Sequence, residues 1–126
     1  MGHFVATAFE EAAITFTGHL AQAGELDFYP ERIGRWWNRD AEIDVLAINL
    51  SEKITFLGEC IWTAHPVGAS VLDDLKQKAG VLMKDHEIIE VQFGLFSRNG
   101  FTPELEDKSM NEGIHLFTVD GLVNNT

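Results

Sequence analysis

The chain has 126 residues, 45% of them hydrophobic, which fits one globular domain, residues 1–126, with a continuous apolar core. Its formal net charge of −11 opposes non-specific binding to nucleic acid, because lysine and arginine contacts to phosphates supply most of that affinity. Apolar runs fall short of the roughly 18 residues that span a membrane, and no signal-peptide pattern opens the sequence, so we expect a cytoplasmic location. The single Cys60 cannot form an internal disulfide and is expected to be a buried thiol.

The first predicted element is an amphipathic helix from Phe4 to about Gly24, because apolar residues recur there at spacings of three and four. The recurring residues are Val5, Phe9, Ala12, Ala13, Phe16 and Leu20. On the helical wheel Glu11 points away from the core, whereas Glu10 lies at the edge of the apolar stripe and can reach inward.

Alternating strands and helices are predicted after this helix. Three strands come first, at Arg32 to Trp37, Glu42 to Asn49 and Ile54 to Trp62, and the short polar segments between them favour an antiparallel meander. A helix from Val67 to Met83, a strand from Ile88 to Ser97, a helix that begins at Pro103 with Thr102 as its cap, and a strand from Ile114 to Val119 complete the chain. Strands joined through covering helices bury a sheet between helices, so the predicted fold class is an α/β sandwich.

Two acidic residues mark neighbouring strands of the predicted meander. Asp44 lies near the start of the second strand and Glu59 near the end of the third. Because side chains alternate along a strand, residue 61 shares a face with Glu59, and Ile61 occupies that position. On spacing alone, the pattern favours a strand-end cap and a surface carboxylate over a metal site.

Four segments carry a resemblance to a known family: GRWWNRDAEIDVLAI, FLGECIW, VLDDLKQKAG and GLFSRNGF. They resemble the C-terminal domain of archaeal-type DEXX-box P-loop ATPases, and the element order resembles the restriction-endonuclease-like core of the PD-(D/E)XK nuclease superfamily. The resemblance covers almost the whole chain. It implies that Asp44 and Glu59 ligate Mg²⁺, that Glu10 assists, and that a lysine two residues after Glu59 orients or deprotonates water. Ile61 departs from that pattern.

The resemblance also implies that the lysine can come from the covering helix, as in some members of the superfamily. Lys78 lies closer to the apolar stripe of that helix than Lys76, so Lys78 is the candidate substitute beside Asp44 and Glu59. The alternative is an i, i+4 ion pair between Lys78 and Asp74 on a solvated helix edge.

Arg32, Arg35 and Arg39 fall within eight positions and are the candidate nucleic-acid contacts. Alternatively they offset neighbouring acids on a solvated surface. Trp36 and Trp37 offer a stacking platform for bases or, more simply, core packing with the two rings on opposite faces of a strand.

The remaining motifs narrow the possible functions. No G-x-x-x-x-G-K-[ST] sequence occurs, so we expect no ATP site, and the histidines and Cys60 have no zinc-ligand spacing. One hypothesis is a nuclease-like accessory domain of a P-loop ATPase, degenerate at Ile61, that contacts nucleic acid or a partner. The second is a Mg²⁺-dependent DNA endonuclease with Lys78 as its lysine, and the third is a protein-interaction module. The expected partners are DNA and an ATPase domain in cis or in trans. We expect no contact with a membrane.

Overall fold

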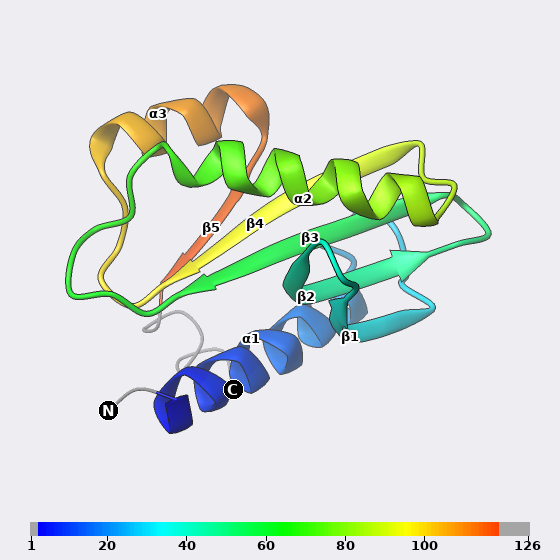
Figure 1. The fold of residues 1–126 in the computed structure, drawn as a ribbon, viewed down its shortest axis with the longest axis horizontal. Helices are drawn as coiled ribbons and strands as arrows, with labels where there is room; N and C mark the ends of the chain where they lie inside the picture. The colour runs from blue at the N-terminus through cyan, green and yellow to red at the C-terminus, as the bar shows by residue number, and fades with distance from the viewer. Residues whose placement is uncertain (1–2, 119–126) are drawn as a thin grey trace.

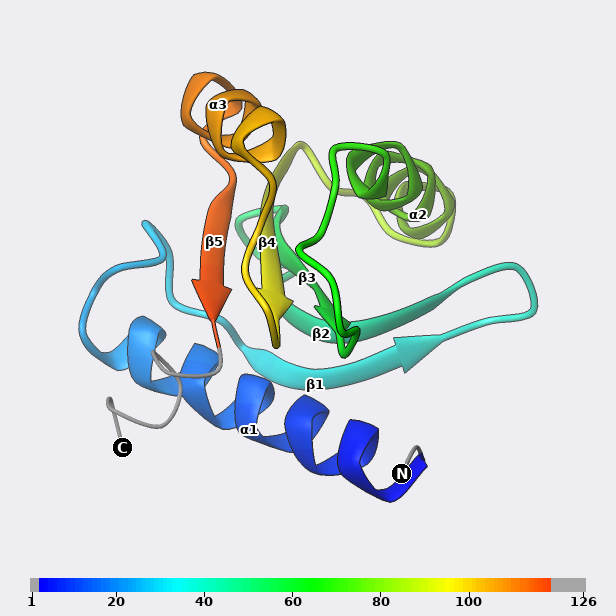
Figure 2. The same cartoon turned by 90° about the vertical axis from the view of Figure 1, so that its left-hand side faces the viewer.

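A computed structural model describes residues 3–118, and their side chains from residue 7 onward. The elements are α1 (His3–Gln22), β1 (Arg32–Trp37), β2 (Glu42–Asn49), β3 (Ile54–Ile61), α2 (Val71–Asp85), β4 (Glu90–Ser97), α3 (Pro103–Glu112) and β5 (His115–Thr118). They form one sheet of order β1-β2-β3-β4-β5, antiparallel from β1 to β3 and parallel from β3 to β5. α1 covers one face, and α2 and α3 cover the other (Figures 1 and 2). The prediction of an α/β sandwich is confirmed.

Apolar side chains fill a separate layer on each face of the sheet. Phe56 and Phe96 are fully buried on the α1 face, where Phe16 of α1 meets Phe96 edge to face. Leu57 and Leu95, one residue along their strands, face α2 and α3 instead. This alternation follows from the two-residue period of a strand and buries the central strands on both sides.

Two sequence predictions about the helices were wrong. Ala12 is exposed, because the inward stripe of α1 runs through Phe9, Ala13 and Phe16 instead. α2 begins at Val71 and not at Val67, because the Val67 amide donates to the Gly100 carbonyl at 2.9 Å and the Thr102 amide donates to the Val67 carbonyl at 2.9 Å. These two bonds hold Val67 in an extended, parallel bridge. No helix in the described part of the chain is long and apolar enough to cross a membrane.

A bulge in β2 shapes the region of the acidic residues. Gly34 of β1 pairs with Leu46, but Trp36 pairs with Ile43, so three steps on β2 oppose two on β1. The extra residue lies at Asp44 and Val45, and a bulge of this kind bends a strand and re-aims its side chains. Pairing between β2 and β3 also stops at Val45, which leaves Asp44 beyond the ladder.

The close approach of β4 to Phe56 requires glycine at position 94. A Cβ atom there would lie 2.3 Å from Cζ of the fully buried Phe56. We therefore expect Gly94→Ala to lower the free energy of unfolding by about 1–3 kcal/mol. Gly80→Ala on the exposed side of α2, where a Cβ meets no atom within 4 Å, should raise it by roughly 0.5–1 kcal/mol. Denaturant unfolding measures both, and equal stabilities would contradict this packing.

Candidate functional site

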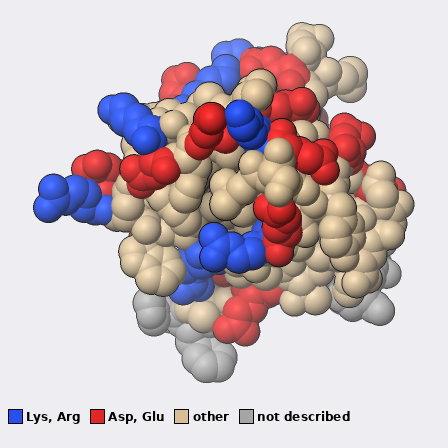
Figure 3. Space-filling view, turned by 90° about the vertical axis from the view of Figure 1, so that its right-hand side faces the viewer, with Lys and Arg blue, Asp and Glu red and all other residues tan. Residues whose placement is uncertain are grey.

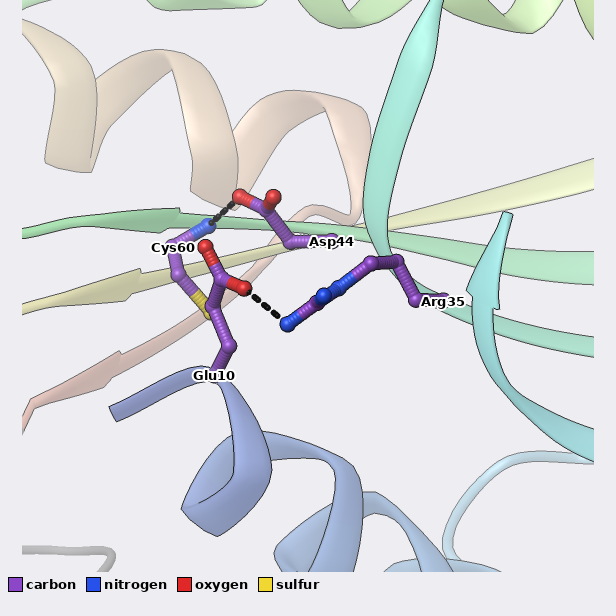
Figure 4. A network of polar contacts seen from close by, with 4 residues as sticks. All are labelled: Glu10, Arg35, Asp44 and Cys60. Carbon is purple, nitrogen blue, oxygen red and sulfur yellow. Dashed lines mark hydrogen bonds and ion pairs between the residues drawn. The ribbon is translucent and has the colours of Figure 1, made fainter. Parts of the chain in front are cut away.

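Asp44 is fixed in the gap that opens between β2 and β3. Its Oδ2 accepts a hydrogen bond from the backbone N–H of Cys60 at 2.9 Å (Figure 4). Since the β2–β3 ladder ends at the Val45–Gly58 pair, the carboxylate replaces the backbone acceptor that a continued ladder would supply. The strands that carry Asp44 and Glu59 are neighbours, as predicted from the meander.

Glu59 points to the opposite side of β3 from Cys60 and meets α2. The Lys78 ammonium donates to its Oε2. The other oxygen, Oε1, is buried and accepts no hydrogen bond within the described part of the chain. The alternative prediction, an ion pair between Lys78 and Asp74, was wrong, because Lys78 pairs with Glu59.

Burial raises the pKa of Glu59 to about 7. The hydrogen bond from Lys78 opposes that shift, and Asp44 adds to it, through its negative charge and as an acceptor for protonated Glu59. Burial and the charge of Asp44 thus outweigh the attraction of Lys78, and Glu59 holds its proton more tightly than an exposed glutamate does.

Glu10 reaches inward from α1, as predicted, but it meets an arginine. Nη2 of Arg35 on β1 lies 2.5 Å from Glu10 Oε1 (Figure 4). Burial and the charge of Asp44 raise the pKa of Glu10, against the attraction of Arg35. Burial, followed by the charges of Asp44, Glu10 and Glu59, also raises the pKa of the Cys60 thiol, which leaves it unreactive as a nucleophile.

Asp44, Glu59 and Glu10 form only part of a binding site for a divalent cation. Within residues 3–118 no three His, Cys, Asp or Glu side chains are grouped closely enough to hold a metal ion. Asp44 and Glu59 provide the hard oxygen atoms that Mg²⁺ prefers, and Glu59 Oε1 receives no hydrogen bond from the residues that the structure describes. Arg35 engages the third predicted ligand, Glu10.

Ile61 lies on the Glu59 side of β3, as strand alternation predicts, and packs against the apolar layer below α2. Beside it opens a pocket of 460 Å³ that Glu59 and Asp74 also line. A second pocket, of 240 Å³, contains Lys78 and shares both of those acids. Glu59 thus faces two hollows, with its lysine on the side away from Ile61.

The three clustered arginines do not share one face. Alternation along β1 places Arg32 and Arg35 on opposite sides of the strand, and Arg35 is already paired with Glu10. Arg39 is exposed beside Asp40 in the turn that follows. On the face shown in Figure 3, blue and red side chains are interleaved and form no continuous basic surface.

The two tryptophans face opposite ways, as predicted. Trp36 packs against the layer below α2 and meets the His86 ring edge to face. Trp37 is 67% exposed and lines a hollow with Arg35 and Arg39. Trp37, and not the pair, is therefore the surface available for stacking.

We expect weak binding to duplex DNA, with a Kd above about 1 μM at physiological salt. Replacing Arg32, Arg35 and Arg39 by alanine should weaken it further. Because Arg35 is paired with Glu10, the slope of log K against log salt should fall by about 2 and not by about 3. Fluorescence anisotropy at several salt concentrations measures this. Sub-micromolar binding that the triple variant retains would contradict the expectation.

Sequence reasoning missed two groups at this site. The Cys60 amide anchors Asp44, and Arg35 holds Glu10, which lies 25 residues away in the chain. The charge of Arg35, opposite to that of the predicted ligand Glu10, was the only signal in the sequence for their contact. The sequence carries no signal for the Asp44 contact, because Cys60 makes it with its backbone amide.

The fold and these contacts define an α/β sandwich domain with interacting acids and a lysine at the end of its central strands. Residues 1–78 match the family DUF234, described as archaea bacterial proteins of unknown function. The match covers more than half of the chain, and the chain belongs to this family.

One curated protein is similar to part of the chain. An uncharacterized protein of Methanocaldococcus jannaschii, MJECL04, is 36% identical over 59 residues. The similarity covers 47% of this chain and 13% of that protein, so the chain spans only a small part of its relative. No solved structure matches the chain.

Proposed function

We propose that this chain is a nuclease-like accessory domain of a P-loop ATPase that contacts nucleic acid or a partner protein without cleaving DNA. The ion pair between Lys78 and Glu59 carries the proposal. An internal cation occupies the carboxylate that a metal ion would need, while Ile61 stands where the superfamily pattern has lysine. The ATPase itself would lie elsewhere, in cis or in trans.

The same residues indicate what metal binding would require. Asp44 and Glu59 would hold the ion, and when bound it would polarise a phosphate group. Glu59 would first release Lys78 and its proton, and Asp44 would have to loosen its bond to the Cys60 amide. Glu10 would have to leave Arg35 before it could assist. Each of these exchanges weakens the site for Mg²⁺.

A Mg²⁺-dependent DNA endonuclease is the second candidate. The observation that favours it is that the Lys78 ammonium, on the covering helix α2, lies within hydrogen-bond distance of Glu59. In that function Lys78 would orient or deprotonate water beside the phosphate, as the relocated lysine of the superfamily pattern.

A plasmid-nicking assay in Mg²⁺ or Mn²⁺, paired with Mn²⁺ calorimetry, separates the two candidates. For the accessory domain we expect no nicking by the wild type and tighter Mn²⁺ binding by Lys78→Met. For the endonuclease, the wild type nicks and Lys78→Met loses about 100-fold or more. Lys76→Met, which removes a cation of the same helix paired with Glu112, is the matched control. Nicking by the wild type would refute the accessory-domain proposal.

A further inference from the structure

Three exposed hydrophobic side chains lie on the connections at one end of the sheet. Among the described side chains, the exposed large hydrophobic ones are Tyr29, Trp37, Leu50, Met83, Ile89 and Met110. Tyr29, Leu50 and Ile89 lie in the α1–β1, β2–β3 and α2–β4 connections, and they are 65%, 44% and 76% exposed. The β2–β3 and α2–β4 connections lie at the right-hand end of Figure 1, and this end faces the viewer in Figure 3.

Hydrogen bonds hold these three connections together. The Tyr29 carbonyl accepts from the Asn49 side chain at 2.9 Å, at the start of the β2–β3 turn. The Ile89 amide donates to the Lys53 carbonyl at 2.7 Å, at the end of the same turn, and Leu50 lies between these two anchors. The turn therefore fixes the other two connections beside it. We call the surface formed by Tyr29, Leu50 and Ile89 the turn surface.

Acidic side chains surround the turn surface. Within three residues of its members the chain carries the acids Asp27, Glu31, Glu52, Glu87 and Glu90 and the cations Arg32 and Lys53. Lys53 is already paired with Glu87 at 3.1 Å. The hydroxyl of Ser51 and the amide of Leu50 donate to Glu31 and lower its pKa, which keeps this carboxylate charged.

The turn surface is separate from the acidic site. Ile54 begins β3 directly after the β2–β3 turn, and Glu59 lies five residues further along the strand, roughly 17 Å away. A molecule bound at the turn surface would therefore leave Asp44, Glu59 and Lys78 uncovered.

The charge of the turn surface decides among its possible occupants. Carboxylates repel the phosphates of nucleic acids and of anionic lipids, and a second copy of this chain would bring the same acids and a net charge of −11. Single exposed hydrophobic residues are ordinary on a protein surface. Hydrophobic residues held together inside a charged rim are instead typical of protein interaction sites.

We propose that the turn surface binds a partner protein that presents hydrophobic side chains surrounded by lysine and arginine. The partner's hydrophobic side chains would cover Tyr29, Leu50 and Ile89, and its cations would pair with the surrounding acids. The inference deepens the proposed function and rests on the domain acting by contact with a protein.

Amide NMR of the whole chain at physiological salt tests the surface with the amphipathic helical peptide LKKLLKLLKKLLKL. We expect saturable shifts at residues 27–31, 49–53 and 86–90, with a Kd on the order of 10–100 μM. LEELLELLEELLEL, which reverses the charge, and SKKSSKSSKKSSKS, which removes the hydrophobic face, should each bind at least about tenfold more weakly.

Matched variants locate the binding. Ile89→Ser and Tyr29→Ser should each weaken the leucine–lysine peptide at least about fivefold. Met110→Ser and Trp37→Ser remove side chains that are 83% and 67% exposed at other places and should change its Kd by less than about twofold. All four substituted residues are exposed, and thermal melts verify that the variants fold.

Several outcomes would overturn the assignment. Equal binding of the serine–lysine peptide would reduce the surface to a charged one, and equal binding of the glutamate peptide would remove the role of the acids. Equal losses in Met110→Ser and Ile89→Ser, or no shifts at about 1 mM peptide, would remove the site. A dimer in sedimentation that Ile89→Ser dissociates would assign the surface to a second copy. Failure here leaves the accessory domain standing on other contacts, whereas nicking by the wild type refutes that proposal and leaves this surface open.

Discussion

Ile61→Lys is expected to nick plasmid DNA in Mg²⁺ at a rate at least about 100-fold above the wild type. Residue 61 shares the sheet face of Glu59, so the new ammonium would approach the acids from the side opposite Lys78. Ile61 is only partly buried and lines a 460 Å³ pocket, which gives the longer side chain room without full desolvation. A positioned cation stabilises the charge that develops on a phosphate during cleavage.

The Ile61→Lys experiment needs two controls. Ile61→Met places a chain of similar length without charge in the same pocket and should remain inactive. Thermal melts of all three proteins exclude unfolding as the reason for inactivity. A folded Ile61→Lys protein that binds Mn²⁺ but leaves plasmid intact would show that the missing lysine is not what prevents cleavage.

Glu59→Gln is expected to change how stability depends on pH. The folded-state pKa of Glu59, about 7, lies above the ordinary value of 4.5, so the folded state holds this proton more tightly. Its contribution is therefore fully present below pH 4.5 and is lost as the pH rises through 7. Relative to the glutamine variant, the wild type should lose about 3 kcal/mol across that window.

Urea unfolding of both proteins at several pH values measures this difference. Subtracting the variant cancels the titration of acids that are distant from Glu59, which is why the comparison is sharper than the wild-type curve alone. Glu11→Gln, an exposed acid on the outer side of α1, is the control for removing one surface charge. Parallel curves for the wild type and Glu59→Gln would contradict the proton linkage.

Local pattern was enough to predict the element order. The bounds of β1 and β2 are those expected from β-branched and aromatic runs between polar turns. The bulge at Asp44 and Val45 was not predictable, because β2 is apolar on both faces and shows no polar–apolar alternation that an extra residue could interrupt. Val67 was misassigned for a related reason: its extended conformation depends on backbone bonds to residues more than 30 positions later.

The site was predictable only in part. Strand alternation placed Ile61 with Glu59, since that relation is local. The choice of partner for Lys78 was not local: a helical wheel leaves both Asp74 and the sheet within reach, and the packing of α2 on β3 decides for Glu59. The pairing of Glu10 with Arg35 likewise depends on how α1 crosses the sheet.

Because the Cys60 amide donates to Asp44, the exchange rate of this one backbone hydrogen reports whether the Asp44 carboxylate is in place. Its protection from deuterium exchange depends on a side chain, because the strand ladder has already ended at Val45 and Gly58. Any event that draws the Asp44 carboxylate away, such as its capture by a cation, would speed exchange at Cys60. The amides of the intact ladder would keep their slow exchange. Occupancy of the site would thus be readable at a single position, without a label or an assay of activity.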